Sequence, residues 1–142
     1  PTGPKGDNGL DGTFTARQVT SKTTGVLATS GQELTTISVA RRYELYRVSV
    51  DRDARVRLYA TQAQRDADAA RPRNVLPEAN SDHGVMLDIA LGGGGPHAIT
   101  LSPLVSGVSM EAVPSSSIPM TVDNLSTTSG PVTVALTYQR RE

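Results

Sequence analysis

The sequence has no cysteine and no tryptophan, and aromatic residues make up only 4% of it. Without cysteine there is no disulfide framework and no thiolate chemistry. The sequence therefore does not indicate whether the protein works in an oxidising or a reducing compartment. One Phe and four Tyr are all the aromatic residues, and the core must therefore be built mostly from Val, Leu, Ile and Ala. Such a core is thin for each chain, which favours help from oligomerisation.

A net charge is also missing, because fourteen basic and fourteen acidic residues cancel. We therefore expect no nucleic-acid partner. No apolar run approaches the roughly 20 residues of a membrane helix, so we expect no membrane insertion. Nine arginines fall between Arg41 and Arg73, interleaved with acidic residues. This mixture predicts a solvated face rather than a basic stripe.

Short segments with alternating apolar and polar residues follow Phe14. The clearest covers residues 54–60, where apolar residues alternate with Arg55, Arg57 and Tyr59, and it predicts a half-buried strand. Segments of the same kind lie at 43–51, 84–91 and 131–139, with weaker ones at 16–21, 25–30, 34–40, 97–103, 107–113 and 118–124. The pattern predicts an all-β fold: an antiparallel, jelly-roll-like β-sandwich of about nine or ten strands.

The stretch TQAQRDADAARP breaks the strand pattern. Thr61 followed three residues later by Gln64 is a capping-box signature, and Pro72 prevents further winding. We expect one short helix over about residues 62–71. Its buried stripe would consist of small side chains: Ala63, Ala67 and Ala70.

Candidate catalytic and metal sites are weak. The glycine-rich turn at 92–96 lacks the Lys-Ser/Thr and the helix of a phosphate loop. His83 and His97 have no partner at ligand spacing. No serine lies in a Gly-x-Ser-x-Gly context, and Asp51 and Asp53 flank a turn, where Asp is ordinary. We expect no catalytic residue, no metal ligand, no cofactor and no enzymatic activity.

Glycine recurs at every third position near the start: Gly3, Gly6, Gly9 and Gly12. The collagen triple helix needs that period because only Gly fits where three polyproline-like chains meet. Lys5 and Asp7 occupy the positions from which collagen chains pair charges. The alternative is a flexible linker. The strict period favours a collagen-like stub over residues 1–13, followed by one β-sandwich head domain over residues 14–142.

The stub also predicts the assembly of the head. Four triplets would not hold three chains together alone, so the head should itself be a homotrimer. A trimeric head raises the local concentration of the stub, and a folded stub stabilises the head. Because the sequence begins at Pro1 without Met, we expect a fragment or a processed product.

Several runs carry a resemblance to a known family: VRLYATQAQRDADAARP, HGVMLDIAL, ITLSPLVSG, VDNLS and PVTVALTY. They make residues from about 33 to 142 similar to the C-terminal β-sandwich of minor tail proteins or tail fibres of actinobacterial phages and prophages. In many of these the head follows Gly-X-Y repeats. The resemblance implies an extracellular virion component of the tail that builds the fibre or contacts a host cell-surface glycan or protein. It assigns no receptor-binding residue.

Two other classes stay open. Trimeric jelly-roll heads of collagen-like bacterial surface proteins share the plan, although those heads are usually richer in aromatics. A carbohydrate-active enzyme on a phage fibre is the third class. Sugar subsites normally stack on exposed aromatics, and only Tyr43 and Tyr59 are expected to face outward here.

Overall fold

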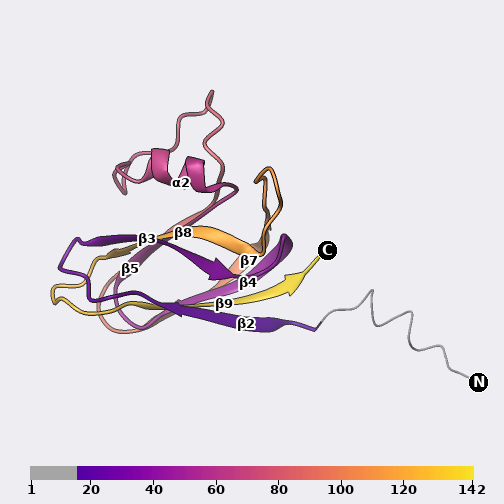
Figure 1. Cartoon of the computed structure of the whole chain (residues 1–142). Coiled ribbons are helices and arrows are strands. Elements are labelled where there is room, and N and C mark those ends of the chain that lie inside the picture. The colour runs from indigo at the N-terminus through magenta and orange to yellow at the C-terminus, as the bar shows by residue number, and fades with distance from the viewer. Residues whose placement is uncertain (1–15) are drawn as a thin grey trace, which may run out of the picture.

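The computed structural model describes residues 16–142, and the predicted stub at residues 1–13 lies outside them. The described chain forms β2 (Gln18–Thr23), β3 (Gln32–Ser38), β4 (Arg42–Val50), β5 (Ala54–Tyr59), α2 (Gln62–Asp68), β6 (Val85–Leu91), β7 (His97–Val108), β8 (Ser117–Asn124) and β9 (Thr133–Arg140). These strands make two four-stranded antiparallel sheets that pack face to face (Figure 1). The prediction of an all-β sandwich with one short helix is confirmed.

The strand pairing is nested around the connection between β5 and β6. One sheet has the order β2-β9-β4-β7 and the other β3-β8-β5-β6, so β5 pairs with β6, β4 with β7, β3 with β8 and β2 with β9. The chain is therefore one long antiparallel hairpin rolled into two sheets, which is the arrangement of an eight-stranded jelly roll. We call β2-β9-β4-β7 the open sheet and β3-β8-β5-β6 the covered sheet.

The core between the sheets is aliphatic, as the composition requires. Leu45, Leu58, Met120 and Leu136 are fully buried. Leu58, Met120 and Leu136 follow a strand alternation, because every second residue of β5, β8 and β9 points between the sheets. In β4 the register shifts between Leu45 and Arg47, so Leu45 and Val48 are both buried although they are three residues apart. Burying each such side chain contributes about 1.5–3 kcal/mol.

Tyr43 was expected to face outward, and this is wrong. It is 1% exposed and lies in the core, where burial raises the pKa of its hydroxyl. Its cross-strand partner is Gly107, and a Cβ there would lie 2.1 Å from the tyrosine ring. The aromatic ring thus occupies the space that the glycine leaves.

The described chain has eight strands rather than the nine or ten expected. Residues 25–30 contribute only an isolated bridge between Leu27 and Gly130. The weak segment predicted at 97–103 lies within the long strand β7, which ends at Val108. Of the segment predicted at 107–113 only the first two residues belong to β7, and residues 109–113 form no strand.

The head has two distinct ends. β2 begins opposite Tyr138 near the end of β9, so the described chain starts and finishes at the same end of the sandwich (Figure 1). The connections at that end include the long segment that carries α2. Four loops connect strands at the opposite end: 24–31, 51–53, 92–96 and 125–132.

Candidate functional site

α2 lies over the outer face of the covered sheet (Figure 1). The predicted cap is confirmed, because the Thr61 hydroxyl accepts a 3.1 Å hydrogen bond from the backbone N–H of Gln64. This bond satisfies one of the free donors of the first turn. The helix ends at Asp68, three residues before the expected end.

The predicted alanine stripe of α2 is wrong. Ala63 and Ala67 are exposed, and the buried residue of the helix is Arg65. Its guanidinium donates a 2.7 Å hydrogen bond to the Thr35 carbonyl of β3. A charged side chain with its own acceptor, rather than a row of methyl groups, therefore fixes this side of the helix to the sheet edge.

Two arginines of β5 lie beneath the helix and were expected on a solvated face. Arg55 is 2% exposed and Arg57 is fully buried, so that expectation is wrong. Arg55 donates two 2.9 Å hydrogen bonds to the carboxylate of Asp88 in β6. Arg57 lies 3.5 Å from Asp68 of α2 and 3.5 Å from Asp123 of β8. Each buried cation is thus paired, as burial in a low-dielectric region requires.

Arg71, just after α2, completes this network. Its guanidinium lies 2.8 Å from Asp68 and 2.7 Å from Asp88. The Tyr59 hydroxyl donates a 2.5 Å hydrogen bond to Asp68. Three arginines and three aspartates therefore balance one another, and we call them the arginine–aspartate cluster: Arg55, Arg57, Arg71, Asp68, Asp88 and Asp123.

The cluster holds two of its carboxylates, Asp68 and Asp88, ionised. Burial raises the pKa of Asp68 and of Asp88, but hydrogen bonds from Arg71 and from Tyr59 or Arg55 outweigh it, so both pKa values lie below their usual range. Burial, helped by the bond to Asp68, raises the pKa of the Tyr59 hydroxyl. These carboxylates are therefore fixed anions at neutral pH and not proton donors for general acid catalysis.

The cluster also ends the helix. Arg57 donates to the carbonyls of Asp68 at 3.0 Å and Ala69 at 3.3 Å. Gln32 of β3 donates to the Ala69 carbonyl at 2.9 Å. Cations and donors at a helix C-terminus satisfy its free carbonyls and favour its dipole. The cluster thus ties α2 to three strands of the covered sheet.

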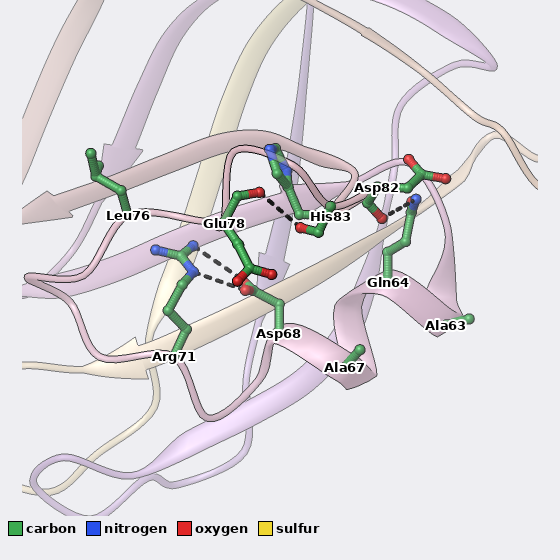
Figure 2. A pocket seen from close by; sticks show the side chains of 10 residues that line it. Ala63, Gln64, Ala67, Asp68, Arg71, Leu76, Glu78, Asp82 and His83 are labelled. Atoms are coloured by element: carbon green, nitrogen blue, oxygen red, sulfur yellow. Dashed lines mark hydrogen bonds and ion pairs between the residues drawn. The ribbon is translucent and has the colours of Figure 1, made fainter.

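A hollow of about 550 Å³ opens between α2 and residues 76–83. Figure 2 shows Gln64 reaching across it to the Asp82 carbonyl, a 3.0 Å hydrogen bond, with Arg71 and Asp68 paired nearby. Its lining combines alanine methyl groups and Leu76, which is 86% exposed, with carboxylates. Within the described residues no three His, Asp or Glu side chains are placed to hold a metal ion.

A second, polar hollow of about 480 Å³ lies among the loops at the opposite end, lined by residues of 51–53, 94–95 and 126–128. Asp53 joins two of these loops, because it accepts a 3.0 Å hydrogen bond from the Gly94 N–H and lies 2.6 Å from His97 Nε2. The bond with His97 is the main cause that lowers the pKa of Asp53. No local pattern predicts this contact, because the two residues are 44 positions apart.

The sequence-predicted residues fall in different places. The predicted trimerisation residues lie outside the described residues: Gly3, Gly6, Gly9, Gly12, Lys5 and Asp7. Tyr59, expected outward, is fully buried like Tyr43. Tyr46 instead faces outward on the open sheet, with the Arg17 guanidinium 4.3 Å from its ring centre.

The comparisons with known proteins found no matching family model, curated protein or solved structure. Among the described residues, no helix has the length and apolar character needed to cross a membrane.

Proposed function

We propose that the protein is the trimeric head domain of a phage tail fibre or minor tail protein, which joins three collagen-like stalk chains and binds the host cell surface. The polarity of the head carries this proposal. The Gly-X-Y register leads into β2, which begins at one end of the sandwich, while four loops lie at the other end. A stalk that enters at the first end leaves the loops at the second end free to meet a target.

The internal chemistry of the head agrees with a structural and adhesive role. Arginine partners lower the pKa of Asp68 and of Asp88, so we assign these carboxylates no catalytic step, and we assign the protein no cofactor. A rigid sandwich whose loops project from one end is a scaffold on which binding residues can vary. The proposal places the head outside the cell, on the tail of the virion.

Light scattering of the full chain tests the assembly. We expect three chain masses in solution. We also expect the melting temperature to fall when residues 1–13 are deleted, because folded stub and trimeric head stabilise each other. A monomer at micromolar concentration would overturn the proposal.

Adhesion needs a separate measurement. A fluorescently labelled head should stain cells of the host and should compete with phage adsorption to them. A trimer that stains cells without slowing adsorption would favour the head of a collagen-like bacterial surface protein. A trimer that stains no permissive host would leave the fibre-building role alone.

A further inference from the structure

The outer face of the open sheet carries two central rows of side chains that run across all four strands. The strand register aligns them as Ser21, Ala135, Ser49 and Ala98 in one row and as Val19, Thr137, Arg47 and Thr100 in the next. Their neighbours along the strands, Val48, Val134 and Leu136, are fully buried, so the row residues point away from the core. Arg47 is the one ionisable group in these two rows.

This face is uncovered. In the described chain no segment lies over the outer side of β2 and β9 (Figure 1). A shallow trough of about 480 Å³ runs over the small residues, lined among others by Ser49, Ala98 and Ala135. Val19 is 70% exposed. Antiparallel sheets that face water usually alternate apolar-in with polar or charged-out. The centre of this face has one charge, Arg47, whereas the other charged groups of the face, Arg17 and the Glu44–Arg141 pair, lie toward the end where β4 begins. A central region with so little charge fits contact with another surface.

The chain before β2 restricts where copies of the head meet. Gly12 is the last glycine in register and Gln18 is the first residue of β2. The six steps between these positions span at most about 20 Å. Resting on the proposed function, in which three chains share one stalk axis, β2 of every copy begins within about 20 Å of the end of that stalk. β2 is an edge strand of the open sheet, whose four strands extend only about 15 Å.

A threefold contact also needs a second, different patch, because a self-complementary patch generates twofold symmetry. The other edge of the sandwich offers one. Apolar side chains that pack on the core but stay partly exposed come from β6 and β7 in the described chain: Met86, Ile89, Leu91, Leu101 and Val105. Beside them Leu104 is 40% exposed and Ile99 is 37% exposed. We call this patch the β6–β7 edge.

We propose that the outer face of the open sheet in one copy packs against the β6–β7 edge of the next copy, so that three copies close a ring around the stalk axis. The partner is a second copy of this chain. The contact covers the two central rows of one copy and the half-exposed aliphatic residues of the next, and their apolar atoms supply burial that the thin core of each chain lacks.

Two charged variants test the two patches, each with a matched control. Ala135→Arg places a cation in the centre of the open face, and Ala63→Arg places the same cation on exposed α2 on the other side of the sandwich. Leu104→Asp changes the β6–β7 edge, and Leu34→Asp changes a leucine that is 39% exposed on the covered sheet. Light scattering should show a threefold drop in mass for Ala135→Arg and Leu104→Asp and no change for the controls.

The outcomes separate this inference from the proposed function. If the wild-type chain is monomeric, the proposed function fails. If it is trimeric and both interface variants stay trimeric, the assignment of the interface fails while the proposed function stands. Circular dichroism shows whether each variant is folded.

A milder probe covers the case in which a charged variant does not fold. Because the sequence has no cysteine, Ala98→Cys and Ala63→Cys each introduce a unique thiol at an alanine that is exposed in the described chain. In the trimer, maleimide should react at least about ten times more slowly at position 98 than at position 63. Equal rates in a wild-type-like trimer would overturn the assignment.

Discussion

The two sheets of this sandwich differ most at equivalent positions of their outer faces. On the covered sheet the central rows are Gln32, Asp123, Arg55 and Ala90, then Leu34, Thr121, Arg57 and Asp88. On the open sheet the corresponding rows hold small or uncharged residues and Arg47. The face whose central rows carry ion pairs is covered by its own chain, and the face whose central rows carry only one charge is not. The difference separates a face completed within one chain from a face left for contact between chains.

The charged residues of the covered face determine the position of α2 more than they raise the net stability of the fold. Burying an ion pair costs desolvation energy that its attraction offsets only with good geometry, so apolar replacements are often as stable. The arginine–aspartate cluster has directional bonds to α2, β6 and β8. We infer that it fixes where α2 lies on the sheet, and that removing one member leaves the others unpaired.

The largest expected effect comes from the fully buried arginine. Arg57→Met should lower the free energy of unfolding by about 3 kcal/mol or more, because it leaves Asp68 and Asp123 short of a buried cation and frees the last carbonyls of α2. The matched change on the open face, Arg47→Met, removes an exposed charge and should change the free energy of unfolding by less than about 0.5 kcal/mol. Urea unfolding at one fixed protein concentration measures both, since trimer stability depends on concentration.

Equal losses in the two variants would contradict the comparison. A large loss in Arg57→Met that is restored when Asp68→Asn is added would locate the cost in the unpaired carboxylate rather than in packing. Such a double-mutant cycle isolates the pairwise contribution because the two groups lie in contact.

A smaller difference in stability is expected between two tyrosine variants, one on each sheet. The Tyr59 hydroxyl donates to the carboxylate of Asp68 inside the cluster, whereas the Tyr46 hydroxyl donates to the Gln139 side chain at 2.7 Å on the open face. Tyr59→Phe should lower the free energy of unfolding by about 1.5 kcal/mol, the range for a hydrogen bond to a charged group. Tyr46→Phe should lower it by less than about 0.5 kcal/mol, because water replaces the partner. A reversed order in urea midpoints would mean that the hydroxyl of Tyr59 is dispensable.

The sequence predicted what depends on local pattern. Alternation located the strands that bury every second residue, and the Thr61 signature located the start of the helix. It predicted too many strands where the pattern was weak, because isolated alternation over residues 25–30 finds no long partner in the fold. The strong strand patterns and the helix start were predicted correctly because neighbouring residues determine them, whereas the alanine stripe was wrong because the packing of α2 on the sheet selects its buried side.

Contacts between distant segments lay beyond the pattern. Period-two alternation shows that Arg55 and Arg57 point away from the core, but not that α2 returns across that face and buries them. In the same way, nothing local links Asp53 to His97. The cluster became recognisable only when strand order placed Asp88 and Asp123 on either side of β5. The collagen-like stub and the trimer remain predictions.

The smallest expected effect is a loss of thermal stability at acidic pH, which we assign to the carboxylates of the covered face. Arginine partners hold the pKa of Asp88 below its ordinary value despite the opposing effect of burial. A carboxyl with a folded pKa below its unfolded value, about 3.9, contributes stability above that pH and loses it as the pH falls through the folded pKa. Thermal midpoints should therefore decline below about pH 4.

Asp88→Asn should be less stable than the wild type at pH 7 and should lose less stability between pH 5 and pH 2, because one shifted carboxyl no longer takes up a proton on unfolding. The open face offers the internal reference, since its central rows contain no carboxylate and Arg47→Met should keep the wild-type slope. Parallel acid slopes in Asp88→Asn and the wild type would assign the acid sensitivity to other carboxyls with lowered pKa values, Asp53 and Glu142 among them. The acid dependence would then not come from Asp88, and among the cluster carboxylates Asp68, whose pKa is also lowered, would be the remaining source.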